Sequence, residues 1–331
     1  MLELSEPDEG VIETLSRSEG DLMLLGAGGK IGHGLALMAR RSLDAAGRSR
    51  RVVAVSRFSD QNVRTAMERD GIAAIPCDLA DMDALSRLPD AADLIYMAGQ
   101  KFGTEGAASA TWMLNTVMPG EVARRWPHSR FVVYSSGNVY PFTTPQSGGP
   151  TEDLEPAPIG EYAQSVLGRE RVFEYFSRTN GTKVVTLRLN YAVEPRYGVL
   201  VDLGMKILSG EPIDLTSGFV NIVWQGDANR ITLRSFGLAS SPPTILNLAG
   251  PQTLSVRDLA GQLGRALEKE PVFTGMEAET ALLSNGSRCW RQFGPPKISV
   301  DEMITRVGAW LKQDGPTMDK PTHFEVRDGK F

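Results

Sequence analysis

The sequence has few of the residues that build metal sites or disulfide frameworks. Among its 331 residues are two cysteines, Cys77 and Cys289, and three histidines, and none of them stand at metal-ligand spacing. Two cysteines so far apart do not make a disulfide scaffold, and such usage is typical of a reducing compartment. We therefore expect a cytoplasmic protein without a metal site.

The sequence also lacks an excess of positive charge and a long apolar run. The formal net charge is −5 at pH 7, which gives no general attraction to nucleic acid or to anionic lipid. No stretch approaches the roughly 20 apolar residues that a membrane span requires. The acidic start, MLELSEPDE, has neither the basic nor the apolar segment of a signal peptide. We expect no nucleic-acid partner and no membrane partner.

What the sequence does contain is an alternation of strand and helix patterns after a short leading helix. The predicted strands, all short and apolar, are 21–25, 51–56, 72–77, 94–98, 131–135 and 183–189. The predicted helices between them are 31–41, 60–70, 81–87, 109–126 and 161–179. This alternation predicts βαβ units with right-handed crossovers, hence an α/β fold with a doubly wound parallel sheet of the Rossmann type.

The rhythm changes after residue 190, where Gly, Pro and charged residues interrupt shorter elements. We predict a dinucleotide-binding Rossmann domain over 1–190 and a smaller C-terminal α/β lobe over 191–331 that covers the substrate. Some segments of the second part, which includes predicted strands at 219–223 and 244–248, are expected to return to the Rossmann sheet. The Pro/Gly/Thr-rich segment 141–158 is long enough to be an active-site lid. The polar tail, 320–331, is either disordered or folded back over the cleft.

The most specific motif is LLGAGGKIG, which directly follows the first predicted strand and opens the first long helix. Glycines at 26, 29 and 32 allow a tight turn, close approach of the backbone to a pyrophosphate, and close packing of helix on strand. The helix N-terminus then directs N–H groups at the phosphates. A glycine-rich turn with a purely structural role is the alternative. The predicted dinucleotide contacts are Gly26, Gly28, Gly29, Lys30, Ile31 and Gly32.

The second predicted strand bears on which dinucleotide is bound. Modules specific for NAD usually carry an acidic residue near its end, for the ribose hydroxyls. Here the strand ends in Ser56 and Arg57, without a carboxylate. Because a guanidinium suits a 2′-phosphate, NADP is favoured over NAD. The alternative is that Arg57 simply points to solvent.

With these residues in view, the chain resembles the extended short-chain dehydrogenase/reductase family over nearly its whole length, and more narrowly the nucleotide-sugar epimerase/dehydratase branch. The motifs that carry the resemblance are CDL at 77–79, YMAG at 96–99, Asn115, VYSSGNVY at 133–140, NLAG at 247–250 and FGPP at 293–296. The resemblance implies that Asp78 and Leu79 lie at the adenine and that Ala98 and Gly99 pass the cofactor. It also implies that Asn115 props the active site and that Ser136 is the catalytic hydroxyl.

The family's catalytic helix carries Tyr-x-x-x-Lys, and here the aligned stretch has Tyr162 but Val166 in place of the lysine. A phenol titrates near pH 10, so a tyrosine that acts as a base at neutral pH needs a nearby cation. Lys101 is the nearest candidate by topology to supply this charge, and Lys30 is the weaker candidate. The alternative is that each is an ordinary surface or phosphate-facing lysine. Alternatively, Tyr162 and Val166 are packing residues, and Ser136 is a strand-end serine bonded to backbone.

Five residues are predicted to contact the substrate, two of them, Asn190 and Tyr191, from the resemblance. The five are Lys101, Asn138, Asn190, Tyr191 and Arg196. The resemblance implies an NAD(P)-dependent epimerase/dehydratase or dehydrogenase that acts by hydride transfer on a sugar, a sugar derivative or a nucleotide sugar. A catalytically silent NADP-binding sensor or scaffold is the alternative, since a retained glycine loop with an eroded catalytic helix fits such a protein. Helices 109–126 and 161–179 correspond to the family's two-fold interface, so a homodimer is expected.

Overall fold

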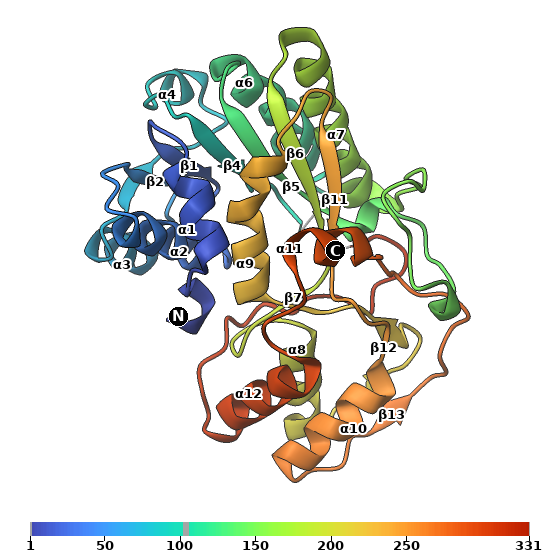
Figure 1. Ribbon diagram of the computed structural model, residues 1–331. Helices are drawn as coiled ribbons and strands as arrows, with labels where there is room; N and C mark the ends of the chain where they lie inside the picture. The colour runs from blue at the N-terminus through green and yellow to red at the C-terminus, as the bar shows by residue number, and fades with distance from the viewer. Residues whose placement is uncertain (1, 102–105, 331) are drawn as a thin grey trace. The chain divides into compact units, whose positions relative to one another are not determined.

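The computed structural model describes residues 2–101 and 106–330. The chain divides into two compact units, drawn in Figure 1. The first unit comprises Met1–Ser135, Glu161–Leu187 and Ala228–Leu246, and the second comprises Ser136–Gly160, Arg188–Asp227 and Asn247–Phe331. The domain boundary at residue 190 stays a prediction. In the structure, residues 136–160 belong to the second unit and residues 228–246 belong to the first.

A seven-stranded sheet runs in the order β11-β6-β5-β4-β1-β2-β3. Its strands are β1 (Leu22–Leu25), β2 (Val52–Ser56), β3 (Ala73–Pro76), β4 (Asp93–Tyr96), β5 (Arg130–Ser136), β6 (Lys183–Leu189) and β11 (Thr244–Leu248). The pairs β1–β2, β1–β4, β2–β3 and β4–β5 are parallel. The predicted Rossmann-type sheet is confirmed, and β11 is a late segment that returns to it. The strand order reverses beside β1, where doubly wound folds bind ligands at the carboxyl ends of the strands.

The burial of each strand follows its place in the sheet. The strands β1 and β4 are fully buried because strands on both sides and helices on both faces cover them. The prediction of a buried strand at 72–77 is wrong for its middle. As an edge strand, β3 leaves Ala73 and Pro76 exposed, and Ile72 and Cys77, which flank it, are buried.

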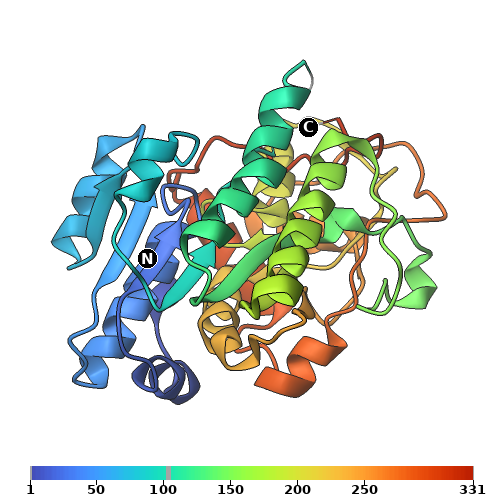
Figure 2. The same cartoon turned by 90° about the horizontal axis from the view of Figure 1, so that it is seen from above.

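Helices of the first unit form where the sequence predicts them, within a few residues. They are α1 (Glu9–Ser16), α2 (Gly32–Ala45), α3 (Gln61–Arg69), α4 (Met82–Ser86), α5 (Ala108–Trp112), α6 (Met118–Arg125) and α7 (Gly160–Asn180). Most of α9 (Gln225–Arg234), for which we predict no range from the sequence, also belongs to this unit. Aspartates set several starts, because the side chains of Asp8, Asp60 and Asp81 accept N–H groups of the turns they cap. A π-helical turn, Met113–Val117, joins α5 to α6, and Figure 2 shows α6 and α7 side by side.

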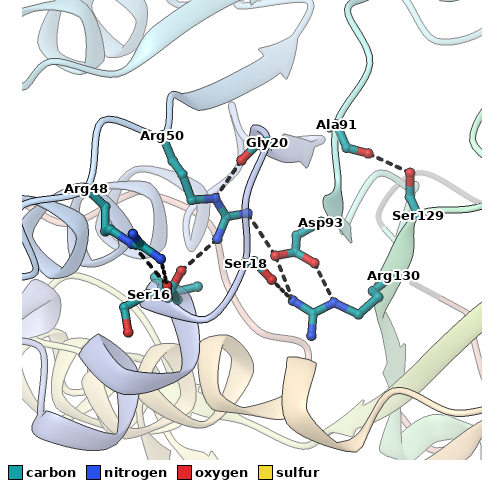
Figure 3. Close-up of polar contacts among 10 residues, drawn as sticks. Ser16, Ser18, Gly20, Arg48, Arg50, Ala91, Asp93, Ser129 and Arg130 are labelled. Atoms are coloured by element: carbon teal, nitrogen blue, oxygen red, sulfur yellow. Dashed lines mark hydrogen bonds and ion pairs between the residues drawn. The ribbon is translucent and has the colours of Figure 1, made fainter.

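A buried ion-pair network lies at the amino end of β4 (Figure 3). Asp93 is 0% exposed, and its carboxylate accepts from Arg50 at 2.8 Å and from Arg130 at 2.8 and 2.9 Å. Arg50 also donates to the carbonyl oxygens of Leu15 and Gly20. The network therefore connects the segment around α1 to the start of the central strands, at the edge of the sheet opposite the glycine loop.

The second unit contains the helices α8 (Val199–Ser209), α10 (Val256–Leu267) and α12 (Val300–Lys312), which pack together (Figure 1). Its other elements are the helix α11 (Ser287–Phe293) and the short strands β7 (Ala192–Val193), β8 (Ile213–Asp214), β9 (Phe219–Val220), β10 (Val223–Trp224), β12 (Leu254–Ser255) and β13 (Phe273–Thr274). The single strand predicted at 219–223 is wrong. It is two strands, because β9 pairs with β12 and β10 pairs with β7.

The tail, described to Lys330, folds along the second unit. The N–H and hydroxyl of Thr322 both donate to Asp202 of α8, and Glu325 pairs with Lys206 one turn further along. Arg327 donates to the carbonyl oxygen of Thr280 at 2.8 Å. The tail therefore folds along its own unit up to Lys330, and its folding over the cleft stays a prediction.

Candidate dinucleotide site and catalytic helix

The loop between β1 and α2 accepts only glycine at its first and last motif positions. Gly26 has a φ of +93°, and a Cβ added there would lie 2.5 Å from the backbone nitrogen of Ala98. A Cβ on Gly32 would lie 2.0 Å from the carbonyl oxygen of Ala27. The turn is therefore tight on the protein side, for the reason predicted from the motif.

The two exposed glycines of the loop have different surroundings. A Cβ on Gly28 would lie 2.4 Å from the hydroxyl oxygen of Ser56, whereas at Gly29 the nearest such atom is 3.7 Å away. The space over Gly29 is open, as close approach of a phosphate to the backbone requires.

The N-terminus of α2 has no side-chain cap. Its N-cap residue is Ile31, and no side chain accepts a hydrogen bond there. The first-turn N–H groups and the positive end of the helix dipole thus face the loop, and Lys30 adds a half-buried cation. These features fit the pyrophosphate of a dinucleotide, which is the group that such a loop and helix end hold.

The end of β2 presents an arginine at the surface. Arg57 is exposed and has no hydrogen bond or ion pair with the residues that the structure describes. Phe58 follows with a φ of +49°, an uncommon conformation for an aromatic residue, and its side chain is 2% exposed. The buried ring of Phe58 lies near the loop glycine Gly28, as does the side chain of Ser56, and Arg57 between them is exposed.

The turn after β3 has the two residues expected at the adenine. Asp78 is exposed, and one carboxylate oxygen accepts the N–H of Ala80 at 3.0 Å. Leu79 is 7% exposed and packs in the same core cluster as Cys77. The aspartate is thus held at the surface by its own turn, with an apolar neighbour beneath it.

Asn115 is fully buried in the π-helical turn and uses its whole amide on protein. Oδ1 accepts from the N–H of Gln100 at 2.9 Å and from Arg169 at 3.0 Å. Nδ2 donates to the carbonyl oxygen of Gln100 and to the hydroxyl of Ser165, both at 3.0 Å. The amide connects the segment after β4 to α7, which supports the propping role that the resemblance implies.

The face of α7 that carries Tyr162 packs closely on the π-helical turn. Tyr162 is half-buried in the first turn of α7, and Val166 is 1% exposed one turn later. A Cβ on Gly168 would lie 2.8 Å from the hydroxyl oxygen of Thr116, which donates to the carbonyl oxygen of Ser165 at 2.8 Å. Position 166 is therefore buried in this chain.

Sequence reasoning missed Arg169, which is 5% exposed on α7. It donates to the carbonyl oxygen of Tyr134 at 2.8 Å and lies over the ring of Tyr96, 5.2 Å from its centroid. Burial raises the pKa of Tyr96 to about 12, and the guanidinium opposes that rise. An arginine on the buried face of a helix that also holds Val166 and Phe173 was the available signal.

Ser136, Asn138 and Asn190 come together in the second unit. The hydroxyl of Ser136 donates to Oδ1 of Asn138 at 2.8 Å and accepts the N–H of Asn138 at 3.1 Å. A Cβ on Gly137 would lie 2.9 Å from Oδ1 of Asn190. Nδ2 of Asn190 is buried and has no hydrogen-bond partner in the described residues. This orphaned donor suits an oxygen of a ligand.

The remaining predicted substrate residues are not equivalent. Arg196 forms a two-pronged ion pair with Glu194, at 2.8 Å for each contact, so its guanidinium is already engaged. Tyr191 is half-buried with a φ of +43°, and burial raises the pKa of its phenol. Lys101 is half-buried in the segment after β4.

A second group that sequence reasoning missed anchors the start of the 141–158 loop. The phenol of Tyr140 accepts from Arg188 at 2.7 Å and donates to Asn247 at 2.9 Å. The backbone N–H of Asn247 donates to Glu152 in the loop, and its side chain donates to the carbonyl oxygen of Pro150. The loop is held at both its entrance and its middle by buried polar contacts, and residues 145–147 form a 3₁₀ turn.

The predicted catalytic pair is divided between the units, with Ser136 in the second and Tyr162 in the first. Their joint action stays a prediction. Among the described residues no three His, Cys, Asp or Glu side chains gather as metal ligands. Cys77 and Cys289 are both buried, and neither forms a disulfide in the described part of the chain. No helix in 2–101 or 106–330 has the length and apolar character of a membrane span.

Comparison with known proteins agrees with this geometry. The model of the NAD dependent epimerase/dehydratase family matches residues 22–230. No curated protein matches the sequence. Solved structures with the same fold include MoeE5 in complex with UDP-glucose and NAD, at 19% identity and a TM-score of 0.71, covering 89% of this chain and 99% of that one.

Two further structures share the fold. The UDP-glucuronic acid 4-epimerase of Bacillus cereus has 17% identity and a TM-score of 0.74, with 88% of this chain and 99% of that chain covered. DesIV, a dTDP-glucose 4,6-dehydratase from Streptomyces venezuelae, has 19% identity and a TM-score of 0.74, with 89% and 97% covered. The family match over most of the first unit, together with the glycine loop at the uncapped end of α2, shows that this chain belongs to the NAD dependent epimerase/dehydratase family.

Proposed function

We propose that this chain is an NAD(P)-dependent enzyme that epimerises, dehydrates or oxidises a sugar, a sugar derivative or a nucleotide sugar. The observation that carries the proposal is the glycine loop. The space over Gly29 is open, and the N-terminus of α2, which has no side-chain cap, faces the loop. Family membership supports it, and the solved relatives named above are complexes with NAD or enzymes of UDP-sugars and a dTDP-sugar. A dinucleotide held there would supply the acceptor and donor of the hydride exchanged with a sugar carbon.

The residues of this chain have separate tasks in the proposed reaction. Tyr162 takes the proton of the reacting hydroxyl and returns it, and Ser136 holds the same oxygen. Asn190 donates its orphaned N–H to a substrate oxygen in the second unit. The loop from Gly26 to Gly32 and the end of β4 hold the dinucleotide.

The first test is mass spectrometry of the small molecules released when freshly purified protein is denatured. Near-stoichiometric NADP or NAD, with a co-released sugar, is the expected result and names the substrate class. Turnover of that sugar is then expected to fall by at least about 100-fold in Tyr162→Phe, the scale of general acid–base catalysis. A Tyr162→Phe enzyme as active as the parent contradicts the proposed mechanism. A chain that binds the dinucleotide and turns over no sugar is the silent sensor instead.

We also propose that NADP is the preferred dinucleotide. Support comes from the exposed guanidinium of Arg57, which follows Ser56 at the end of β2. The position where an NAD-specific module has a carboxylate thus offers a hydroxyl and a planar cation.

A homodimer through α6 and α7 is the proposed assembly. Between these helices lies a groove of about 420 Å³, lined by Thr116, Val117, Gly120, Glu121, Arg124, Arg171, Val172, Tyr175 and Phe176. Val117 and Tyr175 are 48% and 62% exposed although both are large and apolar. The groove combines an apolar strip with charges of both signs, so a second copy related by a two-fold axis complements it.

A further inference from the structure

The buried face of α7 carries a guanidinium that no carboxylate neutralises. Arg169 is 5% exposed, and its three hydrogen bonds go to neutral oxygens, namely the carbonyl of Tyr134, the carbonyl of Asn115 and Oδ1 of Asn115. It forms no ion pair with any residue in the described part of the chain. Because a guanidinium has five N–H groups, one on each terminal nitrogen has no acceptor there.

A buried cation without a counter-ion is unfavourable. The carbonyl dipoles and the face of the Tyr96 ring, 5.2 Å away, compensate for the lost hydration only in part. Such a charge stabilises an anion that forms or binds beside it, because a cation lowers the free energy of a neighbouring negative group.

The guanidinium lies at the edge of the sheet where the glycine loop lies. A Cβ on Gly99 would be 2.4 Å from Nη2 of Arg169, and Gly99 itself is exposed. The preceding residue, Ala98, is in contact on its other side with Gly26 of the loop. The end of β4 is therefore in contact with the dinucleotide loop on one side and with Arg169 on the other.

The charge also lies at the level of α7 that the family's lysine would occupy. Tyr162, Val166 and Arg169 stand at i, i+4 and i+7 on one helix face, and long side chains in helices lean toward the N-terminus. The structure shows this lean, because the guanidinium and the hydroxyl of Ser165 bind the same amide of Asn115. The side-chain amide of Asn115 therefore bridges the guanidinium of Arg169 and the hydroxyl of Ser165.

We propose that Arg169 is the positioning residue that supplies the fixed positive charge missing at Val166. The charge favours the phenolate of Tyr162 and keeps the end of β4 positive where the dinucleotide passes. This inference rests on the proposed function and adds to it the group that completes the catalytic helix. It also explains Val166, since a lysine there would put two buried cations three residues apart on one face.

Other ionisable groups around this helix face set the controls. Lys101 follows β4 and is half-buried, Glu161 is exposed and bonded to Trp112, and Glu170 is held by the hydroxyl of Ser135. Lys101 is the substitute that sequence topology favoured, so Lys101→Met is the matched control for a second cation.

The experiment is a titration of tyrosinate absorbance that needs no substrate and no cofactor. The signal of Tyr162 is the difference between each protein and the same protein carrying Tyr162→Phe. We expect Arg169→Gln to move the midpoint of Tyr162 up by about one pH unit, the lower end of the effect of a near charge. Arg169→Lys and the double variant Val166→Lys with Arg169→Gln are expected to lie within about 0.3 unit of the parent. Lys101→Met is expected to leave the midpoint unchanged.

Two results would overturn the proposal, namely a folded Arg169→Gln protein with the parental midpoint, or a shift produced by Lys101→Met instead. If Arg169→Gln does not fold, the unmodified chain is measured by NMR. The chemical shift of the Arg169 Nε–H group is expected to change as Tyr162 ionises and to stay constant in Tyr162→Phe. A chemical shift that does not change with the ionisation of Tyr162 contradicts the proposed role of Arg169. If the midpoint of Tyr162 shifts but the protein turns over no sugar, the proposed function is rejected and the role of Arg169 is supported. If the protein turns over a sugar but the midpoint does not shift, the role of Arg169 is rejected and the proposed function is supported.

Discussion

At the scale of single residues, Asp93 is the clearest case of a charge that stability requires. Its fully buried carboxylate is shared by Arg50 and Arg130 (Figure 3). Asp93→Asn leaves two guanidiniums facing a neutral amide, and removal of one partner from a buried pair costs about 3–5 kcal/mol. Urea unfolding at pH 7 measures the loss.

The control for this prediction is Asp21→Asn. Asp21 pairs with Arg51, whose side chain is 62% exposed, so the free energy of unfolding is expected to change by less than about 1 kcal/mol. Equal losses in the two variants would show that burial of the Asp93 network is not what matters.

Arg57 decides the dinucleotide preference if the proposal for NADP is right. Arg57→Ala is expected to weaken NADPH binding by about 10- to 100-fold, the range for a lost charge-assisted hydrogen bond. Fluorescence titration with NADPH and NADH gives both dissociation constants. The affinity for NADH is expected to stay within about twofold, and an equal loss for both cofactors contradicts a contact with the 2′-phosphate. Arg64→Ala on α3, a half-buried arginine paired with Glu68, is the matched control.

At the scale of elements, the pair α6 and α7 presents the groove proposed as the dimer interface. Tyr175→Glu places a carboxylate in the middle of the apolar strip, where burial in an interface would be unfavourable. Light scattering after size-exclusion chromatography is expected to show a dimer for the parent and a monomer for the variant. Met276→Glu, at an 82% exposed methionine of the second unit, should leave the dimer intact. A monomeric parent protein would reject the assembly.

The elements also show how much of the secondary structure can be predicted from local sequence patterns. The strands and helices of the first unit follow from apolar runs and helical spacing, because their cores are built from neighbouring βαβ units. The split of 219–223 into β9 and β10 was missed, because each half takes its partner from a different distant strand. The π-helical turn at Met113–Val117 was also missed, since its reason is the buried amide of Asn115 between Gln100 and α7.

At the scale of the whole molecule, stability is expected to depend on pH through Asp202, the residue of α8 that Thr322 of the folded tail contacts. Burial raises the pKa of this carboxyl above its ordinary value, while hydrogen bonds from Thr322 oppose the rise. A raised carboxyl pKa in the folded state means that the native protein binds the proton more tightly than the unfolded chain does. The contribution is therefore fully present below the unfolded pKa of about 4 and is lost as the pH rises through the folded pKa.

Comparison of the parent with Asp202→Asn isolates this contribution. The parent is expected to gain stability relative to the variant as the pH falls from about 7 to about 4, because the amide does not titrate. Thermal unfolding at several pH values within that range gives the difference between the two proteins. A difference that is constant with pH would show that Asp202 titrates alike in the folded and unfolded chains.

The sequence by itself determined the Rossmann-type sheet, the glycine loop after β1 and the loss of the catalytic lysine at Val166. Each of these is a local pattern whose meaning depends on residues within one βαβ unit. Only the tertiary structure decided that the Asn115 amide hydrogen-bonds to protein groups, that Arg196 forms an ion pair with Glu194, and that the tail folds onto its own unit. It also brought Arg169 to Gly99, 70 positions earlier in the chain. Hydrogen bonds and buried charges join residues far apart in sequence, and spacing along the chain carries no record of them.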